Sequence, residues 1–161
     1  MSVCEEYALK FSSKRRTVMV SESAAEVWEK NKQAKNDETE MCGVLVGATS
    51  TNKKKIWIER VTSALPLDIR ARNNYVLKDP GHQLAIDEAH LTSGGTEIYL
   101  GTWHTHPEDY PIPSSIDKTD WRKCMRRNRA RPLVFVIVGR LETRLFYSWA
   151  GSFRQIAPVQ L

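Results

Sequence analysis

The sequence predicts a mixed α/β fold in which helices flank a central mixed β-sheet, and three observations support this. Strand-like and helix-like patterns alternate along the chain from about residue 16 to residue 149. The 161 residues, 41% of them hydrophobic, match the size and apolar content of one compact domain. Neither internal repeats nor low-complexity linkers interrupt the chain. We therefore expect residues 1–161 to form a single domain.

The first half of the chain predicts a strand, a helix and a hairpin. Residues 16–20 form an apolar run that is typical of a strand. Ser23, followed three residues later by Glu26, has the pattern of a capping box and predicts a helix that runs toward residue 35. Residues 41–48 and 55–62 are apolar or alternating runs with a polar segment between them, which indicates a β-hairpin.

The second half continues the alternation. A short strand at residues 74–78 precedes a helix over residues 82–91, and residues 98–104 predict a further strand. A proline-rich loop follows, after which a helix begins at Ser114 and ends near Pro132. Two strands, residues 133–139 and 143–149, close the fold with a tight turn between them.

Cysteine usage and hydropathy exclude several classes of protein. The three cysteines, Cys4, Cys42 and Cys124, lie far apart and form no CxxC pair, so they indicate neither a disulfide framework nor a cysteine-rich zinc site. No window of the sequence reaches the roughly 18 apolar residues that a membrane span requires, and the N-terminus resembles no targeting segment. We therefore expect a soluble protein of the cytoplasm, with no membrane partner.

The net charge of +5 comes from one element. Between Lys118 and Arg131 the chain has seven basic residues and one acid, whereas the rest has 17 basic and 18 acidic residues. The ordinary interpretation of such a run is a solvated helix face. The alternative is a binding surface for an acidic protein or for the phosphate backbone of a nucleic acid.

Two histidines follow the strand predicted at residues 98–104. Because alternate residues of a strand share a face, we expect one side of this strand to carry Ile98, Leu100, Thr102, His104 and His106. Two imidazoles then emerge together at the end of the strand. Taken alone, such an HxH pair is more often structural than metal-binding.

A carboxylate follows on the next helix. Asp117 shares the spacing of one helix face with Ser114, Trp121 and Cys124, so it points inward near the helix start. Ser114 and Asp117 can also be read as a simple helix cap. Two neutral imidazoles and one carboxylate are a standard ligand set for catalytic zinc, which makes His104, His106 and Asp117 a candidate metal site.

Glu40 precedes the strand predicted at residues 41–48 and shares its face with Cys42, Val44 and Val46. A carboxylate at the mouth of a central strand is well placed to act as a general base. Glu38 is an alternative two residues upstream, and either acid could be a solvated charge. We assign no role to Cys42, His82 or His90.

These residues together resemble the JAMM motif of the JAB/MPN metallo-isopeptidases. The motif has a Glu ahead of a glycine-containing strand, here Glu40-Met-Cys-Gly43, and this spacing selects Glu40 over Glu38. It continues with HxHP, here His104-Thr-His106-Pro107, and then, after six residues, with SxxD, here Ser114-Ser-Ile-Asp117. Every signature position is present, and the likeness extends over most of the chain.

The resemblance implies a fold like that of cytidine deaminases and one Zn²⁺ ion held by His104, His106 and Asp117. It implies hydrolysis of the bond after the C-terminus of a ubiquitin-like or similarly conjugated protein. Glu40 would be the proton carrier and Ser114 the donor to the oxyanion. Among small bacterial members, the chain is similar to the JAB-domain isopeptidases of CBASS anti-phage operons, which release conjugates of a cGAS-like nucleotidyltransferase. The substrate would present an extended C-terminal tail.

Three other functions are compatible with parts of the sequence. Zinc nucleobase deaminases need HxE and PCxxC, and the chain has neither. A catalytically inactive MPN-type scaffold, binding partners or nucleic acid through the basic helix, is the main alternative, although such scaffolds usually lack part of the ligand set. A JAB-like protein associated with DNA repair has only the basic helix in its favour.

Overall fold

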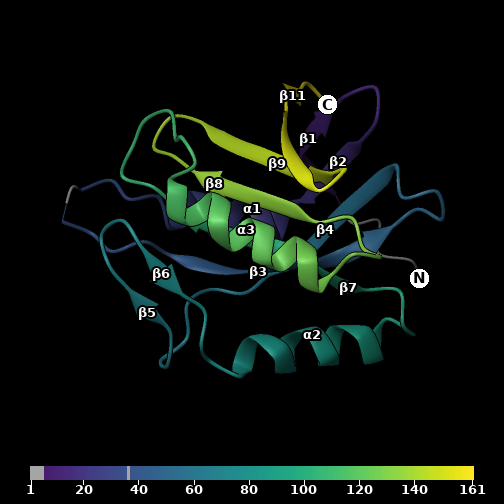
Figure 1. Ribbon diagram of the computed structural model, residues 1–161, viewed down its shortest axis with the longest axis horizontal. Helices are drawn as coiled ribbons and strands as arrows, with labels where there is room; N and C mark the ends of the chain where they lie inside the picture. Colours follow the sequence, from purple (N-terminus) through teal and green to yellow (C-terminus); the bar gives the residue numbers. More distant parts are fainter. Residues whose placement is uncertain (1–5, 36) are drawn as a thin grey trace.

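The structure, a computed structural model, describes residues 6–35 and 37–161, and within these residues nine strands form one mixed sheet. The strand order is β10-β9-β8-β7-β3-β4-β2-β1-β11 (Figure 1). The strands of this sheet are β1 (Tyr7–Ser12), β2 (Thr17–Ser21), β3 (Cys42–Thr49), β4 (Lys55–Val61), β7 (Ile98–Thr105), β8 (Val134–Val138), β9 (Thr143–Trp149), β10 (Ser152–Ile156) and β11 (Pro158–Val159). A separate hairpin pairs β5 (Ile69–Arg70) with β6 (Tyr75–Val76). Two neighbouring pairs, β2 with β4 and β7 with β8, are parallel, so the sheet is mixed as expected.

Three helices of the described chain cover the two faces of the sheet (Figure 1). On one face α1 (Glu22–Lys30) buries Trp28 against the core formed with β1, β2 and β4. On the other face α2 (Gly81–Thr92) packs Ala89 on β3, and α3 (Ser115–Arg127) packs Trp121 on β8 and β9. None of these helices has the length and hydrophobicity needed to cross a bilayer. The predicted class, a central mixed sheet flanked by helices, is confirmed.

The first helix begins and ends earlier than the sequence predicts. Its N-cap is Ser21, whose hydroxyl accepts the Ala24 N–H at 3.2 Å, and not Ser23. The helix stops at Lys30 because Asn31 satisfies its last carbonyls, with the side-chain amide donating to the Val27 carbonyl at 2.7 Å. The prediction failed because β2 leads into α1 without a loop, so the last strand residue serves as the cap.

The sequence analysis did not predict three strands of the nine-stranded sheet, the edge strands β10 and β11 and the strand β1 next to β11. The strand β1 pairs with β2 and β11, and β10 pairs with β9, all of them antiparallel. These segments are partly exposed and lack a clear alternation of apolar and polar residues. The partners β1 and β11 are also remote from each other in the sequence, and a local sequence pattern cannot indicate such pairing.

The strand that carries the histidines has an irregularity that the sequence analysis also missed. Leu45 pairs with Gly101 while Val46 pairs with Tyr99, so Leu100 is an extra residue in β7. Leu100 and Trp103 both pack in the core on the α1 side, whereas Tyr99 packs in the cores on the opposite side. The prediction that Ile98 and Leu100 share a face with His104 is therefore wrong.

Gly101 makes this bulge feasible. Its φ of 134° is one that residues with a side chain rarely adopt. A Cβ atom built on Gly101 would overlap the Val134 carbonyl oxygen of the neighbouring strand. After the bulge, Thr102 and His104 pair with Phe135 and Ile137, which directs the histidine toward the α3 side of the sheet.

We expect Gly101→Ala to lower the free energy of unfolding by more than about 3 kcal/mol, because it adds both backbone strain and a clash with Val134. Gly94→Ala is the matched control. Gly94 also has a positive φ, of 68°, but nothing lies within 4 Å of its Cβ position. The control should lose only about 1 kcal/mol. Urea unfolding curves measure both, and equal losses would contradict this role for the bulge.

Candidate metal centre and its surroundings

Three buried side chains meet at the end of β7 and the start of α3. The Nε2 atoms of His104 and His106 are 3.0 Å apart. One carboxylate oxygen of Asp117 lies 3.2 Å from the His104 Nε2, and the other lies 3.2 Å from the His106 Nε2. The three ligand atoms all lie within 4.8 Å of one another. The structure thus brings together the three residues that the sequence analysis selected as metal ligands.

Backbone pairing holds the two histidines in place. His104 lies in a central strand, paired with Cys42 on one side and with Ile137 on the other. His106 follows the strand and donates its N–H to the Val138 carbonyl at 3.0 Å. Both imidazoles therefore stand on a rigid support.

A capping box holds Asp117. The Ser114 N–H donates to the Asp117 Oδ2 at 2.7 Å, and the Asp117 N–H donates to the Ser114 hydroxyl at 3.1 Å. The cap and the metal-ligand readings of Ser114 and Asp117 are therefore compatible, because the carboxylate closes the helix with one oxygen while both of its oxygens face the imidazoles.

The donor set fits a cation. Glu108 lies 2.8 Å from the Nδ1 of His106, and an Nδ1–H donated to this carboxylate leaves the Nε2 lone pair of the neutral ring facing His104 and Asp117. Two imidazole nitrogens 3.0 Å apart, with two carboxylate oxygens beside them, offer several acceptors and few protons. Sequence reasoning missed Glu108, although an acid two residues after a ligand histidine is a recognisable signal.

Glu40 lies beside this group. Its Oε1 is 3.8 Å from the His106 Nε2, its side chain is 2% exposed, and its buried Oε2 has no hydrogen-bond partner among the described residues. The β5–β6 hairpin fixes its backbone, since the Glu40 N–H donates to the Ala71 carbonyl at 2.8 Å and the Arg70 Nε donates to the Glu40 carbonyl at 2.6 Å. Glu40 is thus held next to the three candidate ligands with one carboxylate oxygen uncommitted.

Burial and charge set the protonation of these groups. Burial raises the pKa of Glu40 to about 8, a shift that His106 opposes and the Asp117 carboxylate reinforces. Burial also lowers the pKa of His104, although Asp117 opposes the shift. For Asp117, burial acts to raise the pKa, but the hydrogen bonds with His104 and His106 outweigh it and hold the pKa below its usual range. A neutral imidazole and an ionised carboxylate are the forms that bind metals.

The hairpin also covers the site with an aromatic ring. The ring of Tyr75, from β6, lies with its centroid 4.8 Å from that of His104. The tyrosine hydroxyl forms a hydrogen bond with the side chain of Thr102 on β7. The sequence analysis expected a strand here but gave none of its residues a role. The contact between Tyr75 and His104 could not be predicted from the sequence pattern, because the two residues are remote in the sequence.

A buried network seats the loop that carries this hairpin. The Asp68 carboxylate is 0% exposed and lies 2.6 Å from the Nε2 of His82, whose Nδ1 lies 2.7 Å from the Thr62 hydroxyl. Asp68 also accepts the backbone N–H groups of Leu65, Lys78 and Asp79 at 2.8–2.9 Å. Asp68 therefore joins both ends of the hairpin loop to α2 and to the end of β4. The sequence analysis assigned no role to His82.

The basic run of α3 is solvated. Arg122, Lys123, Arg126 and Arg127 are exposed, and Lys123 pairs with Asp120 at 3.7 Å. The start of the same helix, at Asp117, is buried in the candidate centre. The exposed face of the second half of α3 is thus positively charged.

Comparisons with known proteins identify the family of the chain. Residues 23–150 match the profile of a family described as prokaryotic homologs of the JAB domain. A protein of Pseudomonas aeruginosa named CD-NTase/cGAS isopeptidase is 35% identical over 127 residues, 78% of this chain and 79% of that protein. A probable metalloprotease of Sinorhizobium fredii is 31% identical over 93 residues, 55% of this chain and 57% of that protein.

A solved structure shares the fold. The solution structure of a Desulfitobacterium hafniense protein superposes with a TM-score of 0.59 and covers 86% of this chain and 88% of that one. The sequence identity is 23%, so this likeness supports the fold alone.

We expect Asp68→Asn to lower the free energy of unfolding by about 2 kcal/mol at pH 7. Burial acts to raise the pKa of Asp68, but the hydrogen bonds from Leu65, Asp79, His82 and Lys78 outweigh it and lower the pKa from 3.8 to about 2. A lowered folded-state pKa means that the ionised carboxylate stabilises the fold above about pH 4.

This stabilisation should disappear as the pH falls from about 4 to about 2. Chemical denaturation at a series of pH values measures it, with Asp120→Asn as the control because the Asp120 side chain is 46% exposed. If Asp68→Asn and the wild type differed by the same amount at pH 2 and pH 7, the carboxylate would not stabilise the loop in this way.

Proposed function

The chain belongs to the prokaryotic JAB-domain family, and on this basis we propose that it is a zinc-dependent isopeptidase with a single JAB/MPN catalytic domain over residues 1–161. The observation that carries the proposal is the buried group of His104, His106 and Asp117 with the uncommitted carboxylate of Glu40 beside it. Two imidazoles and one carboxylate are typical of catalytic zinc sites, which leave one coordination position open.

Each residue has a defined task in the proposed reaction. His104, His106 and Asp117 would hold the ion, and Glu108 would orient His106. A bound zinc ion supplies Lewis acidity, which lowers the pKa of water and polarises a carbonyl oxygen. Glu40 takes the proton of the attacking water on its carboxylate and later gives it to the departing amine. The Ser114 hydroxyl donates to the oxyanion of the tetrahedral intermediate.

The proposed substrate is a protein with an extended C-terminal tail that is joined to another protein. The Pseudomonas aeruginosa relative is named as an isopeptidase of CD-NTase/cGAS, and we propose the same class of substrate, a conjugated nucleotidyltransferase, for this chain. A tail bound as an extended strand would use backbone hydrogen bonds for affinity. Anti-phage defence in the cytoplasm is the proposed setting, and the free thiols of Cys42 and Cys124 fit a reducing compartment.

The proposal is tested by metal content and by one substitution. Elemental analysis of purified protein should find one zinc ion per chain, and removal of the metal should abolish hydrolysis of a nucleotidyltransferase-tail fusion. Glu40→Gln should retain the zinc and the fold but lose hydrolysis, because Glu40 moves a proton and does not hold the ion.

His106→Ala is the matched control for Glu40→Gln, since it should lose both zinc and hydrolysis. Full activity of the metal-free wild type would exclude a metalloenzyme. Wild-type rates in Glu40→Gln would exclude Glu40 as the proton carrier. Zinc binding without hydrolysis of any protein-tail fusion would favour the alternative function of a partner-binding scaffold.

Ser114→Ala should slow turnover, because the loss of an oxyanion donor raises the activation free energy by about 2.7–4 kcal/mol. The zinc content should change little. The substitution also removes a helix cap, which should cost about 1 kcal/mol of stability. Ser21→Ala removes the N-cap of α1 and is the matched control, because it should lower stability but leave turnover unchanged. Equal turnover in both variants would reduce Ser114 to a cap.

The exposed basic face of α3 is the proposed docking surface for an acidic substrate protein. Reversal of Arg126 and Arg127 to Glu should raise KM and weaken its dependence on salt, with little change in kcat, because long-range attraction mainly speeds encounter. Lys14→Glu with Lys30→Glu changes the net charge equally at exposed positions, in the β1–β2 turn and at the end of α1, and should leave KM near the wild-type value. Equal effects of the two pairs would contradict a docking role.

A further inference from the structure

A second polar site lies at the opposite end of α3 from the metal centre. A pocket of about 300 Å³ is bounded by the turn after α3, the turn between β9 and β10, the start of β2 and the turn between β3 and β4. Two of its lining residues, Met125 and Asn128, lie at the C-terminal end of α3. Asn128 is eleven residues beyond Asp117, which is about 16 Å along the helix axis. The pocket and the candidate metal centre are therefore separate.

The pocket is strongly positive. Of the residues that line it, four are basic and none is acidic: Arg16, Lys53, Arg129 and Arg131 are the basic ones. Within residues 6–35 and 37–161, none of these four forms a salt bridge with a carboxylate. By contrast, Arg60, Arg140 and Arg144 each pair with a glutamate or aspartate. The pocket is thus lined by basic side chains whose positive charge no carboxylate of the described residues neutralises.

Arg16 is the unusual member, because it is only 9% exposed. Its Nη1 donates to the Lys53 carbonyl, and its guanidinium lies 5.6 Å from the centroid of the Tyr147 ring. The buried Nε has no hydrogen-bond partner among the described residues. Burial lowers the pKa of Arg16, because a buried guanidinium is poorly solvated. A buried cation without a counter-ion is costly, and a bound anion offsets this cost.

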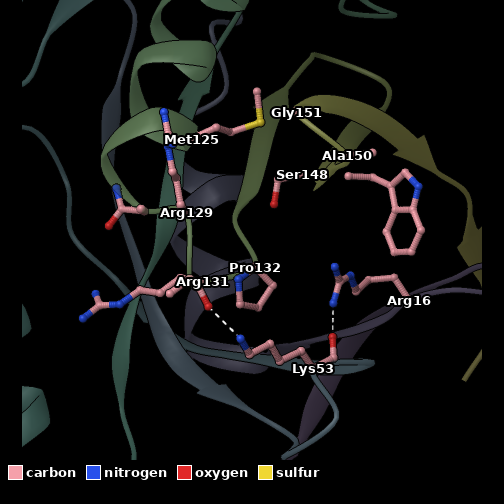
Figure 2. A pocket seen from close by; sticks show the side chains of 12 residues that line it. Arg16, Lys53, Met125, Arg129, Arg131, Pro132, Ser148, Ala150 and Gly151 are labelled. Carbon is pink, nitrogen blue, oxygen red and sulfur yellow. Dashed lines mark hydrogen bonds between the residues drawn. The ribbon is translucent and has the colours of Figure 1, made fainter.

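Figure 2 shows how the basic side chains are placed. Arg16 stands on one wall, Arg129 and Arg131 stand on the opposite wall, and Lys53 lies between them with its Nζ bonded to the Ala130 carbonyl at 2.7 Å. Met125 and Pro132 add apolar surface to the lining. The side chains of Arg129 and Arg131 are exposed and have no hydrogen-bond or salt-bridge partner among the described residues. In Figure 2 the Arg131 side chain extends away from Arg16, so it has to rotate to contact an occupant.

We propose that this pocket binds a phosphate group, either as free phosphate or as the phosphate of a small ester such as a nucleoside monophosphate. Arginine suits this ligand, because its planar fork of N–H donors matches phosphate oxygens. The volume lies at the lower end of the range for small-molecule sites, and the apolar lining would contact the organic part of an ester.

A purely structural role for these residues explains less. Arg16 and Lys53 do link the start of β2, the β3–β4 turn and the turn after α3 through two carbonyl contacts. Such a link needs neither Arg129 nor Arg131, and it leaves the Arg16 Nε without a partner. A bound anion accounts for the excess of positive charge and offsets the cost of burying the Arg16 guanidinium.

Isothermal titration of the full-length protein with inorganic phosphate, adenosine 5′-monophosphate and adenosine tests the proposal at constant ionic strength. We expect one saturable site for each phosphate-bearing probe and none for adenosine. Tighter binding of the nucleotide than of phosphate would identify an ester as the ligand, and equal binding would identify free phosphate. Arg16→Gln, which removes the charge and the fork, should weaken binding by about tenfold or more.

Two further variants guard against a folding defect in Arg16→Gln. Arg129→Ala with Arg131→Ala alters only exposed side chains and should also weaken phosphate binding by about tenfold. Arg154→Ala removes an exposed charge outside the pocket and should change binding less than about twofold.

Three outcomes would overturn the proposal. Absence of binding at millimolar phosphate would mean that the pocket is only a structural link. Binding that Arg16→Gln and the Arg129/Arg131 double variant leave unchanged would place the phosphate elsewhere, for example at the metal centre. Binding of a single-stranded oligonucleotide that phosphate cannot displace, and that Arg154→Ala weakens as much as the other variants do, would indicate a general polyanion surface.

Discussion

The carboxylate of Asp117 has to satisfy two structural demands at once. It closes the first turn of α3 by accepting the Ser114 N–H, and it stands 3.2 Å from each of two buried imidazoles. Because the helix cap fixes the carboxylate and the sheet fixes the histidines, the relative position of β7 and α3 determines the geometry of the whole centre. Trp121, one turn further along α3, stacks on Phe135 of β8 with ring centroids 4.8 Å apart and maintains this position.

The central strand meets a related constraint. To direct His104 toward α3 while Leu100 fills the core on the α1 side, β7 needs an extra residue, and Gly101 supplies the backbone conformation that allows it. Bulges of this kind change the direction of a side chain at functional sites. The same strand thus contributes Leu100 to the hydrophobic core and His104 to the candidate centre, and the bulge between them allows these two side chains to lie on opposite faces of the sheet.

The β5–β6 hairpin connects the proposed proton carrier to the rest of the molecule. It holds the Glu40 backbone through Ala71 and Arg70, and it lays Tyr75 over His104. The hairpin has only four paired residues, so its position depends on Asp68 and the groups that Asp68 gathers. Burial of the Glu40 carboxylate away from water raises its pKa. A bound cation would lower this pKa.

Sequence spacing determined the class of the fold, the family and the choice of His104, His106, Asp117 and Glu40 as candidate residues. Local patterns suffice for these because a central strand, a helix cap and a motif with fixed spacing all lie within short segments. Only the tertiary structure decided the strands β1, β10 and β11, the face of Leu100, and the roles of Asp68, Tyr75 and His82. Arg16 and the pocket that it shares with Lys53, Arg129 and Arg131 belong to the same group. These features depend on contacts between segments remote in the sequence, or on a bulge that reverses the alternation of a strand, and no local period of the sequence encodes either.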